Sequence, residues 1–168
     1  MIYLITGGAR SGKSSHALRL AESMSATPMY IATARIWDTD FKKRVDRHKQ
    51  ERGDNWTSIE EEKHIGTLEL ENKVVVIDCL TLWLTNLFTD HNQNMDNCLN
   101  EARQNLDALA QQQATVILVT NEIGMGVHAH TETGRRFTDL QGWTNQHAAS
   151  LADEVILMVS GIPVTVKS

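Results

Sequence analysis

The first fourteen residues constrain the fold most, because a short apolar run passes directly into a glycine-rich loop. Ile2–Thr6 leads into GGARSGKS (7–14), a full match to the phosphate-loop pattern G-x-x-x-x-G-K-[S/T]. Such glycines let successive backbone N–H groups surround phosphate oxygens, and a helix beginning near Lys13 would add its positive end. A glycine-rich turn next to a solvated lysine is the plainer alternative. The pattern predicts a strand, a helix and, between them, a nucleotide phosphate site formed by Gly7, Gly8, Ala9, Arg10, Ser11, Gly12, Lys13 and Ser14.

The rest of the chain alternates short β-rich runs with longer amphipathic stretches. Runs such as KVVVID and ATVILVT are continuously apolar, as parallel strands covered on both faces are. We expect further strands at Met29–Thr33, Val74–Asp78, Thr115–Thr120, Glu154–Val159 and Val164–Lys167. We expect helices at Lys13–Met24, Thr39–Glu51, Leu80–Phe88, Met95–Gln112 and Thr133–Leu151, and a polar surface loop at Asp90–Asn97.

These elements predict one α/β domain over residues 1–168, with a mostly parallel sheet and helices on both faces. The last strand follows SGIP, a connection too short for a helical crossover. It should therefore pair antiparallel at the edge of the sheet.

Composition narrows the class of protein. The chain has 168 residues, 22% of them charged, and a net charge of −5, which argues against a nucleic-acid partner because a phosphate backbone attracts basic surfaces. Two cysteines, Cys79 and Cys98, are too few for a disulfide framework. No signal segment or membrane-spanning run is recognisable, so we expect a cytoplasmic protein.

A phosphate loop usually works with a carboxylate at the end of a neighbouring apolar strand, where it helps to hold Mg²⁺. In this chain KVVVID places Asp78 there, and the hydroxyl of Ser14 would be the second protein ligand. The alternative is that Asp78 simply caps the helix that follows.

The choice of nucleotide enzyme rests on one basic segment, FKKRVDRHKQERGDNW (41–56). Switch-GTPase signatures are absent, because Asp78 is followed by Cys-Leu-Thr and TNEIG (120–124) does not match N-K-x-D. Read as a helix, the segment places Arg44, His48 and Arg52 on one face. Nearby cations disfavour a protonated His48, which leaves a ring nitrogen free as a nucleophile. The alternative is a solvated basic face with an incidental histidine.

Longer segments resemble one family along nearly the whole chain, the bifunctional adenosylcobinamide kinase / adenosylcobinamide-phosphate guanylyltransferases of cobalamin biosynthesis. The matching segments are TGGARSGKS (6–14), YIATA (30–34), RVDRHKQER (44–52), DCLTLWLTNL (78–87), VTNEIGMGV (119–127) and residues 134–164. The resemblance implies a RecA-like P-loop NTPase fold, a homotrimer, and ATP or GTP as substrates together with adenosylcobinamide and its phosphate. Two rival functions are a P-loop kinase without nucleotidyl transfer and a non-catalytic GTP-binding regulator.

The resemblance also implies roles for individual residues. GTP would donate GMP to His48 and release pyrophosphate, and His48 would pass GMP to adenosylcobinamide phosphate. A covalent intermediate of this kind divides one displacement into two. Glu60 would read the guanine base, the alternative being a solvated charge. Besides the phosphate loop, the nucleotide contacts implied are Ala32, Thr33, Ala34, Lys49, Gln50, Glu51, Arg52, Glu60 and Asp78.

The chain departs from the family pattern in three places. Asp78 stands where a glutamate is usual, Gly53 follows Arg52 where a proline is common, and VHAHTE (127–132) replaces an apolar-Pro pair. The last difference bears on acceptor recognition. His128 and His130 within it are more often solvated than metal-bound.

Overall fold

The computed structural model describes residues 1–35 and 53–168. The helix expected at Thr39–Glu51 lies outside these residues. Seven strands of the described part form one sheet, in the order β3-β2-β4-β5-β1-β6-β7. The strands are β1 (Ile2–Gly7), β2 (Met29–Ala32), β3 (Thr57–Glu60), β4 (Val74–Asp78), β5 (Thr115–Val119), β6 (Glu154–Val159) and β7 (Ile162–Lys167).

Neighbouring strands are parallel except at one edge, where β7 pairs antiparallel with β6. The turn between them contains Gly161 at φ 85°, a conformation that glycine adopts without steric cost. The prediction of a mostly parallel α/β sheet with an antiparallel edge strand is therefore confirmed.

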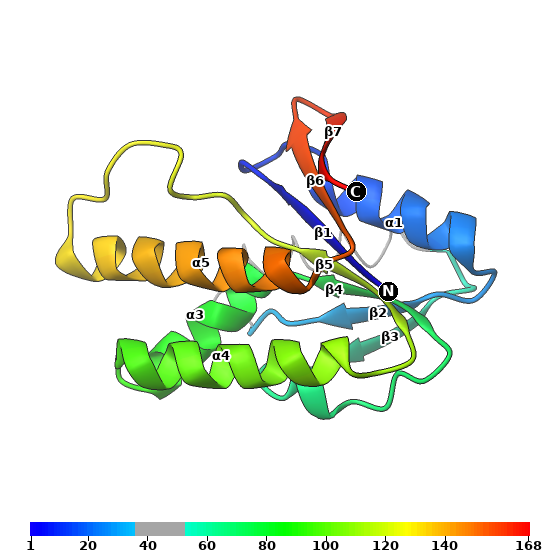
Figure 1. Ribbon diagram of the computed structural model, residues 1–168, viewed down its shortest axis with the longest axis horizontal. Coiled ribbons are helices and arrows are strands. Elements are labelled where there is room, and N and C mark those ends of the chain that lie inside the picture. The colour runs from blue at the N-terminus through cyan, green and yellow to red at the C-terminus, as the bar shows by residue number, and fades with distance from the viewer. Residues whose placement is uncertain (36–52) are drawn as a thin grey trace.

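Helices cover both faces of the sheet (Figure 1). One face carries α1 (Lys13–Met24). The other carries α3 (Leu80–Asp90), α4 (Met95–Ala110) and α5 (Glu132–Leu151). In the described residues no helix is long and apolar enough to cross a membrane.

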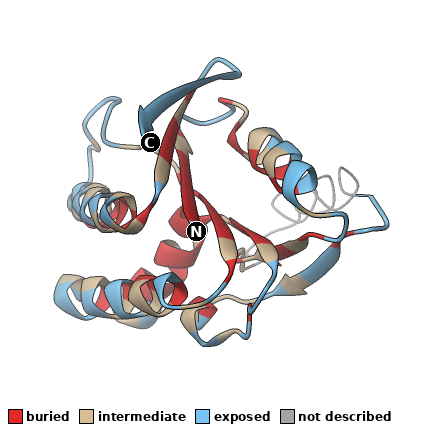
Figure 2. Ribbon diagram, turned by 45° about the vertical axis from the view of Figure 1, so that its right-hand side comes forward, coloured by how far each residue is buried: buried red, intermediate tan, exposed pale blue. Residues whose placement is uncertain are grey.

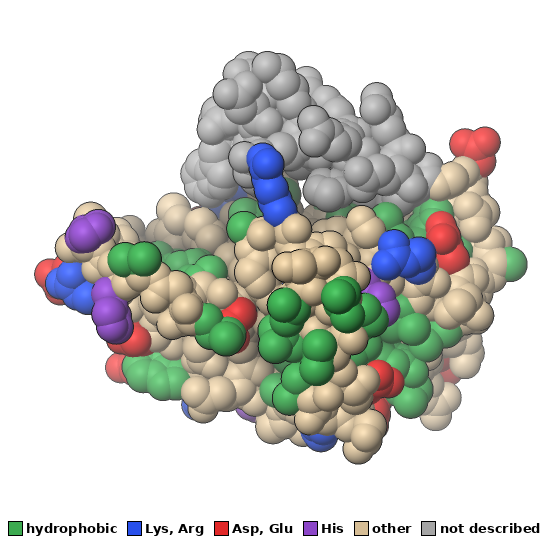
Figure 3. Space-filling model, turned by 90° about the horizontal axis from the view of Figure 1, so that it is seen from above, with side chains coloured by type: hydrophobic (Ala, Val, Ile, Leu, Met, Phe, Trp, Pro, Cys, Tyr) green, Lys and Arg blue, Asp and Glu red, His purple; other side chains and the backbone are tan. Residues whose placement is uncertain are grey.

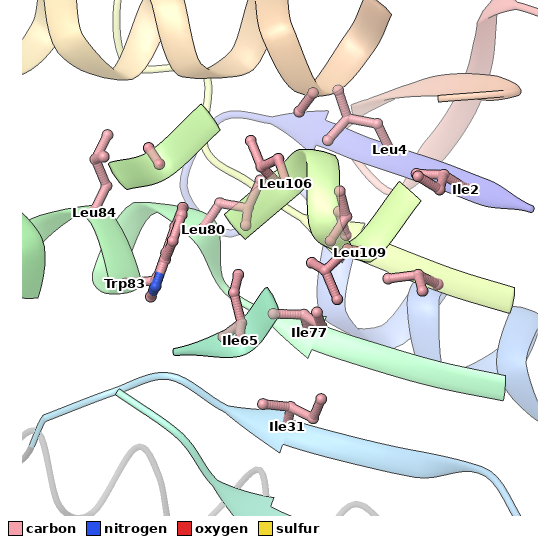
Figure 4. Close-up of a cluster of buried hydrophobic side chains, with 14 of the residues drawn as sticks. Ile2, Leu4, Ile31, Ile65, Ile77, Leu80, Trp83, Leu84, Leu106 and Leu109 are labelled. Atoms are coloured by element: carbon pink, nitrogen blue, oxygen red, sulfur yellow. The ribbon is translucent and has the colours of Figure 1, made fainter. Parts of the chain in front are cut away.

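Two apolar cores follow from this layering, and burial is greatest along the central strands (Figure 2). The larger core lies between the sheet and α3–α5 and includes Ile77, Leu80, Leu106 and the fully buried Trp83 (Figure 4). The indole nitrogen of Trp83 donates to the carbonyl of Lys63 at 2.8 Å, so its one polar group is satisfied. The smaller core lies under α1 and includes Tyr3, Tyr30 and Trp56.

One expectation about local structure was wrong, and one strand was missed. Asp90–Asn97 is not a loop throughout, because α3 extends to Asp90 and α4 begins at Met95. The side chain of Asn94 accepts a hydrogen bond from the Asn97 amide at 3.0 Å and so caps α4. The helix therefore begins within the polar stretch, and the loop is shorter than expected. The strand β3 was also missed, because only Ile59 in TSIE is even partly buried.

Candidate active site

The phosphate loop lies between β1 and α1 and has the backbone that its glycines predict. Gly7 has φ 148°, and a Cβ there would meet the Met158 carbonyl oxygen at 2.6 Å, so only glycine fits. Gly12, with φ 93°, is the N-cap residue of α1. Within the described residues no side chain caps this helix, so its first N–H groups remain available to an anion.

Lys13 lies folded back into this loop. Its side-chain nitrogen donates to the carbonyl oxygen of Gly8 at 2.6 Å and to the Ser11 hydroxyl at 3.4 Å. Burial lowers the pKa of Lys13, while the neighbouring Cys79 and Asp78 act in the opposite direction. The ammonium group is thus held within the loop by these two hydrogen bonds.

Asp78 ends β4 and is half buried. Its Oδ2 accepts a hydrogen bond from the Tyr30 hydroxyl at 3.1 Å. The residue at the N-cap of α3 is Cys79, so the alternative that Asp78 caps this helix is wrong.

The carboxyl ends of three neighbouring strands bring predicted site residues into one row. Ala32 of β2 is in register with Glu60 of β3 on one side and with Asp78 of β4 on the other. Glu60 is exposed, and the next amide, that of Glu61, donates to the Ala32 carbonyl at 3.0 Å. Ala34 is half buried two residues beyond β2.

Thr33 differs from its neighbours because its side chain is fully buried. Its hydroxyl donates to the Cys79 carbonyl at 2.8 Å and accepts from the Cys79 amide at 2.9 Å. The side chain thereby holds the backbone just after Asp78. A nucleotide contact by Thr33 stays a prediction.

Five residues expected at the site, His48, Lys49, Gln50, Glu51 and Arg52, lie outside the described residues. They belong to residues 36–52, between Arg35 and Gly53.

Sequence reasoning missed a polar cluster behind the phosphate loop, at the end of β5. The Glu122 amide donates to the Gly7 carbonyl at 3.1 Å, which ties the end of β5 to the loop. Asn121 is held at both backbone groups, since its amide donates to the Thr81 hydroxyl at 3.0 Å and its carbonyl accepts from the Asn145 amide group at 3.1 Å. The sequence indicated this region only through the family-like segment VTNEIGMGV (119–127), and its polar residues gave no sign of a shared contact.

The loop between β5 and α5 borders a hollow of about 140 Å³ lined by Ile123, Val127, Arg135 and Asp139 among others. Arg135 donates to the carbonyls of Ala129 at 3.2 Å and His130 at 3.0 Å, which fastens the loop to α5. His128 and His130 are exposed. Met125 and Val127 also extend into solvent, 76% and 89% exposed.

The oxygen donors of this region suit Mg²⁺, a hard cation that keeps several waters and binds substrate phosphates. Ser14 in the first turn of α1 and Asp78 at the end of β4 supply a hydroxyl and a carboxylate. In residues 1–35 and 53–168 no three His, Cys, Asp or Glu side chains gather as a metal site of their own. This donor set therefore fits a metal that binds together with a nucleotide.

Comparison with known proteins extends over nearly the whole chain. Residues 3–166 match the family model described as cobinamide kinase / cobinamide phosphate guanyltransferase. The bifunctional adenosylcobalamin biosynthesis protein CobU of Escherichia coli (strain K12) is 40% identical over 182 residues, covering 99% of this chain and 100% of the relative. The bifunctional adenosylcobalamin biosynthesis protein CobP of Pseudomonas aeruginosa is 39% identical, covering 98% of this chain and 96% of the relative.

Among solved structures, a prototypical ATPase from the type III secretion system of pathogenic bacteria superposes with a TM-score of 0.62. The match covers 98% of this chain and 56% of that chain at 10% identity, so it bears on the fold alone.

Proposed function

The chain belongs to the cobinamide kinase / cobinamide phosphate guanyltransferase family, and from this premise we propose that one phosphate-loop site serves both reactions. The observation that carries the proposal is the placement of Lys13 within the phosphate loop, together with a carboxylate, Asp78, at the end of β4. A cation for the β- and γ-phosphates and a carboxylate at the neighbouring strand end are the two parts that phosphoryl transfer requires.

In the first reaction the hydroxyl oxygen of adenosylcobinamide attacks the γ-phosphorus of a nucleoside triphosphate, ATP or GTP. The bond from that phosphorus to the bridging oxygen breaks, the nucleoside diphosphate leaves, and the hydroxyl proton passes to water. The loop amides of residues 7–14 bind the phosphates, and Lys13 turns from the Gly8 carbonyl toward the β- and γ-phosphates. Ser14 and Asp78 would hold Mg²⁺, which neutralises phosphate charge when bound.

In the second reaction a ring nitrogen of His48 attacks the α-phosphorus of GTP and pyrophosphate leaves. A phosphate oxygen of adenosylcobinamide phosphate then attacks the same phosphorus, which releases His48 and forms adenosylcobinamide-GDP. Glu60 accepts hydrogen bonds from the guanine N1–H and amino group. Its position in the row with Ala32 and Asp78 supports this role.

We infer that the acceptor binds near the loop between β5 and α5. This loop starts beside Gly7, and it exposes Met125 and Val127 next to the hollow lined by Arg135. Apolar groups with a few polar neighbours suit a large ring system better than a small polar substrate.

We also infer a cytoplasmic homotrimer, as the family resemblance implies. Free Cys79 and Cys98 are compatible with a reducing compartment. On β7, Ile162, Val164 and Val166 are 64%, 46% and 64% exposed, and hydrophobic side chains gather on that side of the molecule (Figure 3). Light scattering on the purified protein would test the trimer.

Intact-mass measurement after incubation with GTP tests the central step. We expect a GMP-sized adduct that is labile in acid, stable in base and absent from His48→Ala. His64→Ala, which changes an exposed histidine, should retain it. Cobinamide phosphorylation without any adduct would favour a kinase alone. Nucleotide binding with neither product would favour a non-catalytic regulator.

A further inference from the structure

The hydroxyl of Tyr30 is the hydrogen-bond donor to Asp78. Tyr30 lies in the middle of β2, opposite Val76 of β4, and Asp78 is two residues further along that strand. Tyr30 and Val76 belong to the core beneath α1, and alternation along β4 places Asp78 on this same face. The Tyr30 hydroxyl therefore reaches diagonally across the two strands to Oδ2 of Asp78, at 3.1 Å.

The phenol ring is itself held in place. Tyr30 is 5% exposed, and the ring of Trp56 packs edge-on against it with centroids 6.3 Å apart and an interplanar angle of 76°. The Trp56 indole nitrogen donates to Oε1 of Glu22 on α1 at 3.0 Å. Thus contacts run from α1 through Trp56 and Tyr30 to Asp78, so the hydroxyl has little freedom to turn away.

We propose that Tyr30 is a positioning residue that sets the orientation of the Asp78 carboxylate for Mg²⁺ bound with the nucleotide. The proposal rests on the metal role of Asp78 proposed above. A carboxylate on a strand end can rotate about its last bond, and a hydrogen bond to one oxygen fixes the direction of the other. Partners of this kind commonly change metal affinity by about 10- to 100-fold when they are removed.

The test uses the full chain with Mn²⁺ as a spectroscopic replacement for Mg²⁺ and the α,β-methylene analogue of GTP, which cannot release pyrophosphate. Electron paramagnetic resonance measures the free Mn²⁺ at each concentration and so the affinity of the protein–nucleotide complex. The affinity for the analogue alone is measured in EDTA. We expect Tyr30→Phe to weaken Mn²⁺ binding about tenfold and to leave the EDTA value unchanged.

Tyr3→Phe is the matched control. Tyr3 is buried in the same core at 7% exposure, and its hydroxyl donates to the Met1 sulfur at 3.2 Å, not to Asp78. Both affinities of this variant should equal those of the wild type. A similar loss of Mn²⁺ binding in Tyr3→Phe would overturn the proposal, because core packing would then explain the effect.

Asp78→Asn distinguishes the positioning role of Tyr30 from the metal role of Asp78. If Asp78→Asn weakens Mn²⁺ binding and Tyr30→Phe stays within twofold of the wild type, the positioning role is wrong and the proposed metal site stands. If Asp78→Asn has no effect, both are wrong. A Tyr30→Phe variant that also loses nucleotide affinity in EDTA would indicate a loosened fold and contradict the proposal.

Discussion

Arg35 and Asp90 form a two-pronged ion pair, with Nη1–Oδ1 at 3.0 Å and Nη2–Oδ2 at 3.2 Å. The Nε of Arg35 also donates to Glu62 at 2.7 Å, and Lys63 contacts Asp90 at 2.9 Å. The group thereby joins the residues after β2, the residues after β3 and the last residue of α3. The Arg35 guanidinium and then Lys63 hold the pKa of the Asp90 carboxyl well below its usual range.

Asp90→Asn should therefore lower the free energy of unfolding by about 1 kcal/mol at pH 7. This value is the upper end of what surface ion pairs contribute to stability, and it is expected here because the Arg35–Asp90 pair is bidentate. Because the folded pKa is depressed, the stabilisation is fully present above the unfolded aspartate value of about 4 and is lost as the pH falls toward the folded pKa. Urea unfolding at pH 7 and pH 3 measures this difference.

The difference in unfolding free energy between the wild type and Asp90→Asn should be smaller at pH 3 than at pH 7. Asp54→Asn, which neutralises an exposed aspartate in the turn before β3, should leave stability nearly unchanged at both values. A gap of constant size at pH 7 and pH 3 would show that the charge of Asp90 is not its source.

Lys13→Ala should reduce cobinamide phosphorylation by at least about 100-fold, because the developing phosphate charge loses a preorganised cation. Lys73→Ala is the matched control, since that exposed lysine bonds the Glu69 carbonyl away from the loop. Initial rates with saturating triphosphate measure both variants. Near-wild-type phosphorylation by Lys13→Ala would contradict the assignment of the triphosphate to this loop.

Both thiols should resist modification in the native protein. Burial raises the pKa of Cys79 to about 12, with the charge of Asp78 adding to the effect, and burial raises the pKa of Cys98 to about 11. Since the thiolate is the reactive form, a disulfide reagent at pH 8 should label them about 100-fold or more slowly than an exposed cysteine. In urea, both cysteines should react; rapid native labelling of either would be inconsistent with these pKa values.

Much of the fold was predictable because strong local signals coincide with the main elements. The phosphate-loop pattern located β1 and α1, and the apolar runs located β4 and β5. The strand β3 gave no such signal, because it lies at the sheet edge with three of its four residues exposed. The start of α4 at Met95 was predicted correctly, and the expected loop at Asp90–Asn97 overlapped it because the residues around the Asn94 cap are polar.

Site residues that belong to a local sequence motif were predictable. Site residues that meet only through the pairing of distant strands or the packing of separate helices were not. Asp78 was expected from its position after an apolar strand. The role of Tyr30 could not be predicted in this way. Its contact with Asp78 exists only because β2 lies next to β4 in the sheet, and 41 residues separate these two strands in the sequence. Asn121 was missed for the same reason, since Thr81 and Asn145 come from separate helices.

A pair of glycines tests how closely α4 packs against the turn after β3. A Cβ on Gly66 would lie 2.7 Å from the backbone oxygen and 2.8 Å from the Cα of Asn105, and backbone cannot move aside as a side-chain end can. Gly66→Ala should therefore cost about 2 kcal/mol of unfolding free energy.

Gly142→Ala is the matched change, because Gly142 lies inside α5 and a Cβ there has no neighbour within 4 Å. Alanine in a helix interior is favoured over glycine by about 0.5–1 kcal/mol, so this variant should be more stable than the wild type. Urea unfolding of both variants gives the two changes directly. Both substitutions lower the entropy of the unfolded chain, which by itself favours the folded state. Opposite signs are therefore expected only if the backbone contact at Gly66 outweighs this shared effect. Changes of the same sign would contradict a limit set by the close approach of Gly66 to α4.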